Sequence, residues 1–307
     1  MSDVSWSRRL DDYDIERLLG IGGMAEVYLG RAVAGPWSGR PVAIKRLRRD
    51  LADREDILDR FLGEADLARL VTHPSIVEVL ETGLMGEQPY LVMEYVDGPD
   101  LGRVIDECGR RGMKLPVDFC AHIAIRVLES AEGLHEAVAR DGTPLSIVHC
   151  DLNPSNVFLT RNGEIKIGDL GVAVVGALEG GGGGGVVAGK LSYLAPEQAA
   201  GEVVDHRADL FAIGVMFFEL LTGRPPFRAD SLEGLLAAVQ SGPPDLTELR
   251  DDIPSGLPEI VVRALSFETD RRYSRASVLR SALEGFRDPV IGNDLAVAAL
   301  VRHLRLD

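Results

Sequence analysis

The residues best suited to chemistry lie in one short segment, HCDLNPSN, at positions 149–156. In it Asp151 and Asn156 stand five positions apart behind His149. Carboxylate and amide oxygens suit Mg²⁺, so this spacing is typical of a loop that grips the metal ion of a nucleotide. No Lys or Arg lies between His149 and Asn156, although a loop that handles phosphate is expected to carry one or two. The segment therefore indicates phosphate chemistry of a variant kind.

A glycine-rich segment, GIGGMAEV at 20–27, is expected between two strands, where its backbone amides could approach a phosphate chain. Gly20 and Gly22 are present, but Ala25 stands where a third glycine would complete GxGxxG. An ordinary glycine-rich hairpin fits equally well. Because a strand and not a helix is expected to follow, the segment does not indicate a dinucleotide-binding fold.

Lys45 ends the strand VAIK in a chain that has only four lysines among 33 basic residues. A compact ammonium in a strand expected to be buried suits phosphate binding; the alternative is a lysine that reaches from the strand end to solvent. Glu64 is a candidate to hold Lys45, or else one charge on a solvated helix face. Lys45 and Glu64 together are therefore a candidate phosphate-binding pair.

A second acidic turn, KIGDLG, places Asp169 directly after an expected strand. With Asn156 it would make an all-oxygen Mg²⁺ site that water and phosphate oxygens complete. Alternatively, Asp169 serves only a hairpin turn. The choice depends on the elements that carry these residues.

The hydrophobic pattern predicts a sheet-rich first third and a helical remainder. Residues 13–47 alternate apolar segments with glycines, which predicts three antiparallel strands. A helix is predicted over 53–70, and further strands over 76–84, 89–96, 157–160 and 164–169. The later helices are predicted over 101–112, 116–138, 205–222, 231–240, 257–266 and 273–286. The glycine run at 180–185 is flexible by composition.

Composition excludes several classes of protein. Apolar residues make up 46% of the 307 and charged residues 26%, which is ordinary for a globular fold. The net charge of −15 argues against nucleic acid and anionic membranes as partners, so phosphate binding requires a local pocket. Three cysteines without CxxC spacing indicate neither a disulfide framework nor a zinc site. The longest apolar run, 210–218, is too short to span a bilayer, so we expect a soluble, cytoplasmic chain.

The order of these motifs makes the chain resemble a eukaryotic-like bacterial serine/threonine protein kinase from about Tyr13 to about Phe286. The resemblance rests on ordered motifs along nearly the whole chain: GIGGMAEV, VAIK, Glu64, MEYVDG at 93–98, HCDLNPSN, DLG at 169–171, APE at 195–197, DLFAIG at 209–214 and Arg272. It implies an α+β fold with two lobes, a small antiparallel sheet with one main helix over 13–96 and a larger, mainly helical lobe over 97–286. Residues 1–12 and 287–307 would be an extension and a tail, and 169–197 the activation segment.

The resemblance also implies ATP and Mg²⁺ as cofactors and a role for each site residue. Asp151 would accept the proton of the substrate hydroxyl, Lys45 paired with Glu64 would hold the α and β phosphates, and Asn156 and Asp169 would bind Mg²⁺. Met93 would be the gatekeeper, Glu94 and Val96 would offer backbone groups to adenine, and Asp100 is a candidate for the ribose. The remaining implied nucleotide contacts are Leu19, Gly20, Gly22, Gly23, Val27, Ala43 and Phe158. Asp209 would brace the catalytic loop, and Glu197 would pair with Arg272.

Two positions depart from the family. Most relatives have HRD and a Lys two residues after the Asp, whereas this chain has Cys150 and Asn153. The missing Arg normally receives a phosphate on the activation segment, and residues 169–191 contain no Ser, Thr or Tyr. The sequence therefore predicts activity without phosphorylation of that segment. Cys150 is either a site of reversible oxidation or a small buried residue.

The missing lysine would neutralise the transferring phosphoryl group, and its loss could cost about 2 to 4 kcal/mol of transition-state stabilisation. Lys190 stands where relatives commonly have a Thr that contacts the catalytic Asp. We hypothesise that Lys190 reaches back and supplies the missing charge; the alternative is a solvent-facing lysine beside the glycine run.

Three functions stay open: a protein kinase acting on Ser or Thr of a protein substrate, a pseudokinase that binds nucleotide or partners, and a small-molecule kinase similar to aminoglycoside phosphotransferases. Retention of Lys45, Glu64, Asp151, Asn156 and Asp169 disfavours the second. GKLSYLAPE, Asp209 and Arg272 disfavour the third, and DLNPSN resembles the Ser/Thr form of the loop. The sequence leaves open the oligomeric state and whether the tail packs on the domain or on another chain.

Overall fold

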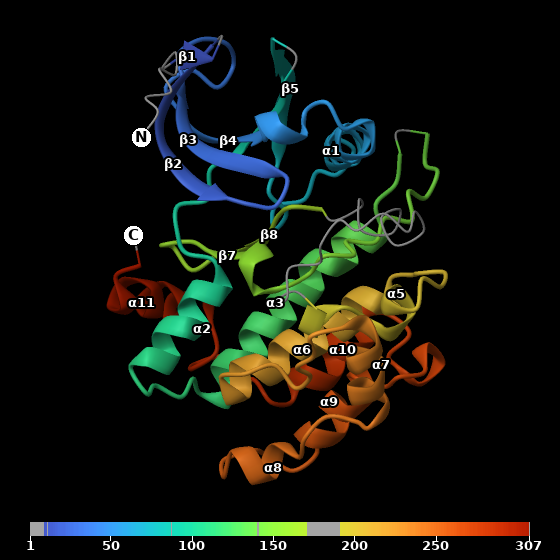
Figure 1. The fold of residues 1–307 in the computed structure, drawn as a ribbon. Coiled ribbons are helices and arrows are strands. Elements are labelled where there is room, and N and C mark those ends of the chain that lie inside the picture. The colour runs from blue at the N-terminus through green and yellow to red at the C-terminus, as the bar shows by residue number, and fades with distance from the viewer. Residues whose placement is uncertain (1–8, 11, 87, 140, 171–190, 307) are drawn as a thin grey trace. The chain divides into compact units, whose positions relative to one another are not determined.

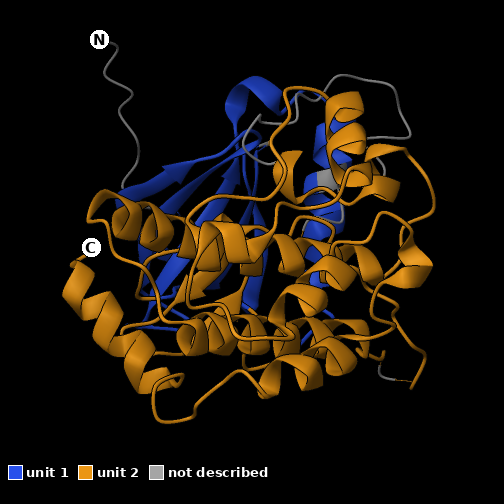
Figure 2. Ribbon diagram, turned by 90° about the horizontal axis from the view of Figure 1, so that it is seen from below, with its two compact units in different colours: residues 1–72, 77–96 blue, residues 73–76, 97–307 orange. Residues whose placement is uncertain are grey.

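The computed structural model describes residues 9–10, 12–86, 88–139, 141–170 and 191–306 (Figure 1). The chain divides into two compact units, which Figure 2 colours separately. Unit 1 comprises residues 1–72 and 77–96, and unit 2 comprises residues 73–76 and 97–307. Each unit has its own core and carries its own share of the predicted site residues.

Unit 1 contains a six-stranded antiparallel sheet with the strand order β1-β2-β3-β4-β6-β5. The strands are β1 (Arg9–Leu10), β2 (Tyr13–Ile21), β3 (Ala25–Ala32), β4 (Pro41–Leu47), β5 (Val79–Met85) and β6 (Gln88–Glu94). Strands that are consecutive in the sequence pair with one another, except that β4 pairs with β6 and not with β5. The central strand β4 is therefore hydrogen-bonded on both edges.

Alternating side chains of β4 separate two apolar clusters. Val42 and Ile44 join one cluster, whereas Ala43 and Leu47 pack with Phe61 of helix α1 (Glu55–Ala68) in the other. The short helix η1 (Arg49–Leu51) precedes α1. Because side chains alternate along a strand, position 45 belongs to the same face of β4 as Ala43 and Leu47. The sheet thereby turns position 45 toward α1.

Unit 2 is built around two buried helices, α3 (Val117–His135) and α6 (Arg207–Thr222). Residues 208–221 of α6 are all buried, which explains the long apolar run in the sequence. The other helices are α2 (Leu101–Arg110), η3 (Leu191–Tyr193), α5 (Pro196–Ala199), α7 (Leu232–Gln240), α8 (Leu246–Leu249), α9 (Leu257–Ala264), η4 (Thr269–Arg271) and α10 (Ala276–Glu284). Helix α10 packs on α3, and α9 packs on α6.

A small hairpin connects the helical core to residues 149–156, which are called the catalytic loop below. It is formed by β7 (Val157–Leu159) and β8 (Ile165–Ile167), and the one-turn helix η2 (Pro154–Asn156) runs directly into β7. Backbone hydrogen bonds join Ser75 to Ile167 and Pro99 to Leu159. The hairpin therefore fixes the ends of both the catalytic loop and the segment that reaches Asp169.

The C-terminal tail folds as helix α11 (Asp294–Leu304), and it packs on α2 and β7 (Figure 1). Arg111 donates hydrogen bonds to the last carbonyls of this helix, those of His303 and Leu304. Asp294 accepts a hydrogen bond from the buried His122 at 2.9 Å. The tail, whose packing the sequence left open, thus packs on unit 2.

The predicted α+β class is correct, with a sheet followed by a mainly helical region. Observed helices begin or end one to three residues inside several predicted ranges, as at 53–70 and 273–286. Among the elements that were not predicted, β1, α5 and α8 are each four residues or shorter. Within the described ranges, no helix is both long and apolar enough to cross a membrane.

Candidate active site

In unit 1 the predicted pair of Lys45 and Glu64 is present as a buried ion pair. Lys45 Nζ donates to Glu64 Oε1 at 2.7 Å, and both side chains are 9% exposed. Strand β4 turns Lys45 toward α1, and Glu64 follows the buried Phe61 by one helical turn. Removing one partner of such a pair leaves an uncompensated charge that costs about 3 to 5 kcal/mol. The pair therefore holds the ammonium in a single position.

The glycine-rich turn joins β2 to β3, and the amide of Gly22 donates to the carbonyl of Ala25 at 2.7 Å. A Cβ atom added at Gly20 or Gly23 would meet nothing within 4 Å, and neither glycine has a positive φ. Packing and backbone conformation therefore do not require glycine there. Close approach of a ligand to the backbone does explain it.

The predicted adenine-side residues lie on neighbouring strands of the same sheet. Ala43 of β4 pairs with Met93 of β6, and both side chains are buried. Leu19 is 37% exposed at the end of β2. Val27, Glu94 and Val96 are partly exposed. This side of unit 1 thus combines apolar side chains with main-chain groups near the end of β6.

In unit 2 the carboxylate of Asp151 is held by two amide side chains. Asn153 Nδ2 donates to Asp151 Oδ1 at 3.2 Å, and Asn156 Nδ2 donates to Asp151 Oδ2 at 3.1 Å. The same two nitrogens also donate to the main-chain oxygen of Asp151, each at 2.8 Å. Asn153 and Asn156 are both buried. The backbone and the side chain of Asp151 are therefore oriented together.

The one-turn helix η2 places these amides. Asn153 caps it, because its Oδ1 accepts from the amide of Ser155 at 3.0 Å and from the Ser155 hydroxyl at 2.5 Å. Pro154 occupies the first position of the turn, where a missing N–H costs nothing. The residue that replaces the family's lysine is thus part of the loop's own framework.

Asp209 braces the catalytic loop from α6, as predicted. Its Oδ2 accepts from the amide of His149 at 2.8 Å, and its Oδ1 accepts from the amide of Cys150 at 2.9 Å. His135 Nε2, on α3, also lies 2.8 Å from Oδ2. Burial raises the pKa of Asp209, but hydrogen bonds and charge from His135 and His149 outweigh it, so the pKa is lowered. The carboxylate is therefore ionised, and both of its oxygens accept hydrogen bonds.

His149 joins the catalytic loop to the segment before Asp169. Its Nε2 donates to the carbonyl of Gly168 at 3.1 Å, and its Nδ1 accepts from the amide of Asp151. The amide of Gly168 donates in turn to the carbonyl of Asn156 at 2.9 Å. These bonds bring the residue before Asp169 beside Asn156.

The donor set at Asn156 and Asp169 suits Mg²⁺. Asn156 donates to Asp151 twice from its side-chain nitrogen, and these two hydrogen bonds do not involve its amide oxygen. Asp169 is partly exposed and has a left-handed φ of 55°, which Asp tolerates better than most residues. No group of three or more His, Cys, Asp or Glu in the described ranges could hold a metal. Mg²⁺ takes one or two carboxylates and completes its shell with water and phosphate.

Asp100 and Phe158, predicted as nucleotide contacts, lie at the start of α2 and in β7. Asp100 caps α2 by accepting from the amide of Arg103 at 2.9 Å, and an isolated β-bridge joins Asp100 to Phe158. Burial raises the pKa of Asp100 despite these hydrogen bonds. Asp100 therefore has a structural function at the start of α2, and its contact with the ribose stays a prediction.

The predicted pair of Glu197 and Arg272 is also present. Two parallel hydrogen bonds of 2.7 Å join them, and the Arg272 side chain is fully buried. Arg272 donates further to the carbonyl of Ser266 at 2.8 Å. This bidentate pair fixes α5 on unit 2.

Two contributors escaped the sequence reasoning. Gln198, next to Glu197, donates from Nε2 to the carbonyl of Cys150 at 2.9 Å, and its Oε1 accepts from the amide of Ala195 at 3.0 Å. His135, the last residue of α3, binds Asp209. The sequence position of neither Gln198 nor His135 predicts the residue that it contacts. Lys190 lies outside the described residues, and its predicted position stays a prediction.

Cys150 is buried and has a left-handed φ of 64°. Burial raises the pKa of its thiol, and the charges of Asp209 and Asp151 raise it further. Because the thiolate is the reactive form, this environment disfavours oxidation. Of the two alternatives for Cys150, the structure favours the small buried residue.

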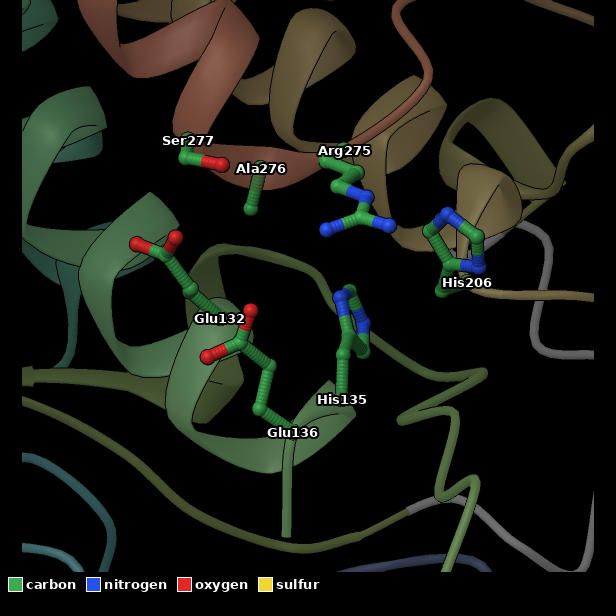
Figure 3. Close-up of a pocket in the computed structure, with 7 residues that line it drawn as sticks. All are labelled: Glu132, His135, Glu136, His206, Arg275, Ala276 and Ser277. Carbon is green, nitrogen blue, oxygen red and sulfur yellow. The ribbon is translucent and has the colours of Figure 1, made fainter. Parts of the chain in front are cut away.

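A separate cavity of about 250 Å³ lies at the end of α3 (Figure 3). Glu132, His135 and Glu136 line it on the α3 side, and His206 and Arg275 line it from other segments. Among the predicted site residues that the structure describes, none lines this cavity. One of the lining residues, His135, also binds Asp209.

Comparison with known proteins assigns the family. A sequence model described as "Protein kinase domain" matches residues 13–283. The chain belongs to the protein kinase domain family. Kinase relatives include PksC, a serine/threonine-protein kinase of Streptomyces coelicolor, which is 38% identical over 87% of this chain and 48% of its own length. MasK of Myxococcus xanthus, named a tyrosine-protein kinase, is 37% identical over 89% of this chain and 43% of its own length.

Solved kinase structures agree. The kinase domain of Mycobacterium tuberculosis PknI superposes with a TM-score of 0.68 at 29% identity, covering 90% of this chain and 97% of that domain. The chain spans less than half the length of the curated kinases named above. The kinase fold predicted from the motifs is therefore confirmed over most of the chain.

Proposed function

We propose that this chain transfers the γ-phosphoryl group of ATP to a Ser or Thr hydroxyl of a protein substrate. The observation that carries the proposal is the clamped carboxylate of Asp151, bound at one oxygen by Asn153 and at the other by Asn156. A general base must be held within hydrogen-bond reach of the proton it takes. A carboxylate bound at each oxygen by an amide donor keeps a fixed direction, as that role requires.

Two other residues of unit 2 would hold the metal ion. Asn156 and Asp169 would be its protein ligands, because they are oxygen donors brought near one another by the bond between Gly168 and Asn156. When bound, Mg²⁺ neutralises developing charge on the phosphate oxygens. The protein's contribution is to fix these two donors by the hydrogen bonds of His149 and Asp151.

The residues of unit 1 would bind the rest of ATP. Lys45, held by Glu64, would bind the α and β phosphates, and the amides of the turn around Gly20 and Gly22 would cover them. Ala43 and Met93 offer apolar surface to adenine, with backbone groups of Glu94 and Val96. This assignment explains the buried ion pair and the glycines that packing does not require.

We further propose that the kinase needs no phosphate on the activation segment. Residues 169–191 offer no hydroxyl to modify, and Cys150 replaces the arginine that would bind such a phosphate. The catalytic loop is instead held by uncharged and carboxylate groups, above all by Asp209. Support for this proposal comes from the sequence of the segment and from these phosphate-independent contacts.

The experiment incubates purified protein with ATP, Mg²⁺ and a generic basic protein substrate and identifies phosphosites by mass spectrometry. We expect phosphoserine or phosphothreonine that Asp151→Asn abolishes, with no phosphate on residues 169–191. In a second arm, Lys190→Ala should lower kcat at least about tenfold, if Lys190 supplies the missing charge; a change within about twofold would exclude that hypothesis. Phosphotyrosine alone, or no transfer above Asp151→Asn, would contradict the proposed function.

A further inference from the structure

Gln198 connects two parts of unit 2 that lie 48 residues apart in the chain. It belongs to α5, its side chain is buried, and both ends of its amide are used. Nε2 donates to the carbonyl of Cys150 at 2.9 Å, and Oε1 accepts from the amide of Ala195 at 3.0 Å. One side chain thus joins the end of the activation segment to the catalytic loop.

The carbonyl that Gln198 binds belongs to the peptide bond that leads into Asp151. On its other side, the amide of Cys150 donates to Asp209 at 2.9 Å. Cys150 has a left-handed backbone conformation, which is unfavourable for a residue other than glycine. Such a conformation persists only where its surroundings hold it in place. Asp209 binds the amide of Cys150, and Gln198 binds its carbonyl, so both main-chain groups of this residue are held.

The element that carries Gln198 is itself anchored. Its neighbour Glu197 is bound to the fully buried Arg272 by two hydrogen bonds of 2.7 Å. Arg272 in turn donates to the carbonyls of Ser266 and Phe267. Gln198 therefore extends from a fixed support, and its hydrogen bond can transmit that support to the catalytic loop.

We propose that Gln198 is a positioning residue for Asp151. It ties the catalytic loop to the end of the activation segment through an uncharged hydrogen bond, where the chain lacks the arginine that would make a phosphate-dependent tie. The inference rests on the proposed kinase function and explains how that function dispenses with phosphorylation. The simpler alternative is that Gln198 only satisfies two buried backbone groups.

Two variants test the hydrogen bonds of Gln198 separately. Gln198→Met keeps the length and suits a buried site but removes both hydrogen bonds. Gln198→Glu, assayed at pH 8.5 to favour the ionised carboxylate, keeps an acceptor for Ala195 and removes the donor to Cys150. Gln240→Glu, at the exposed end of α7, is the matched control for the added charge. Steady-state kinetics and amide hydrogen exchange are measured on all four proteins.

For both Gln198 variants we expect kcat to fall about tenfold or more and KM for ATP to stay within about twofold of wild type, because the chemical step loses its oriented base. Amide exchange should accelerate in the peptide covering 149–156 and stay unchanged in α10. Gln240→Glu should match wild type in every measurement. This combination separates positioning from general stability.

Other outcomes overturn the proposal. If Gln198→Met keeps kcat within about twofold of wild type, catalysis does not depend on the tie. If exchange rises equally in α10, or stays unchanged in 149–156, Gln198 has a structural role only. If the wild type transfers no phosphoryl group, the proposed function fails, but the exchange data still decide whether Gln198 holds the loop. Should Gln198→Glu not fold, Gln198→Met decides alone.

Discussion

Asn153 stands where most relatives have a lysine, and it makes contacts of a different kind. A lysine there would supply positive charge, which an amide cannot. The amide does donate to both the carbonyl and the carboxylate of Asp151, and its oxygen caps η2 through Ser155. Asn153 therefore orients the carboxylate of Asp151 but cannot supply the positive charge of a lysine.

We predict that Asn153→Asp lowers kcat by about 10²-fold, within the range that general-base catalysis contributes. The substitution keeps the acceptor for Ser155 but replaces the donor nitrogen with an oxygen that faces the Asp151 carboxylate. The introduced carboxylate repels that of Asp151, so the base loses the orientation that the Asn153 nitrogen gave it. Single-turnover kinetics with saturating ATP measure the effect.

Asn162→Asp is the control for Asn153→Asp, because it makes the same chemical change at an exposed position of the β7–β8 turn. It should leave kcat unchanged. If Asn153→Asp retains kcat within about twofold of wild type, the hydrogen bond from Asn153 to Asp151 does not contribute to catalysis. The thermal unfolding of both variants must be compared, since Asn153 is buried.

At the scale of elements, periodicity predicted what depends on local sequence. Apolar segments that alternate with glycines predicted β2, β3 and β4, and helical spacing predicted α1. The pairing of Lys45 with Glu64, which the family resemblance implied, is present in the structure. The short elements β1, α5 and α8 carry too few residues for a period to show. Their existence depends on contacts that form only after the chain has folded.

The contacts of Gln198, Asn153 and His135 could not be predicted for a related reason. Each is a hydrogen bond from a common polar residue to a backbone or carboxylate group, and no spacing encodes its direction. Gln198 and Cys150 meet only because α5 is fixed by Arg272, itself 75 residues from its partner Glu197. Family resemblance supplied the residues with fixed roles but not the ones that hold them in place.

Gly163 offers a test of the packing between α11 and the β7–β8 hairpin. It has a φ of +94°, and a Cβ there would lie 1.8 Å from the main-chain oxygen of Asp294, the first residue of α11. We predict that Gly163→Ala lowers the free energy of unfolding by about 2 to 4 kcal/mol, combining backbone strain with displacement of the helix. Urea denaturation measures the loss.

Gly142→Ala is the matched control for Gly163→Ala. Its φ of +85° imposes a similar strain, but a Cβ there meets nothing within 4 Å. It should cost only about 1 to 2 kcal/mol, and amide exchange in α11 should accelerate in Gly163→Ala alone. Equal losses in the two variants would mean that α11 does not depend on close contact with the hairpin.

For the molecule as a whole, the net charge of −15 is the dominant long-range property. Such a charge favours solubility, and it also attracts basic partners from a distance, because the fields of many side chains add. Only the second effect depends on the substrate. Its size can therefore be separated from solubility by changing the substrate and the salt concentration.

We predict that kcat/KM for a basic protein substrate falls roughly three- to tenfold as NaCl rises from about 20 to about 200 mM, because the screening length shortens below about 10 Å. A short, uncharged Ser/Thr peptide is the control, and its kcat/KM should change by less than about twofold. The fall should appear in KM and not in kcat, since screening weakens encounter and leaves the clamped base of Asp151 untouched. Equal salt dependence for both substrates would mean that salt acts on the kinase itself, and that its acidic surface serves solubility alone.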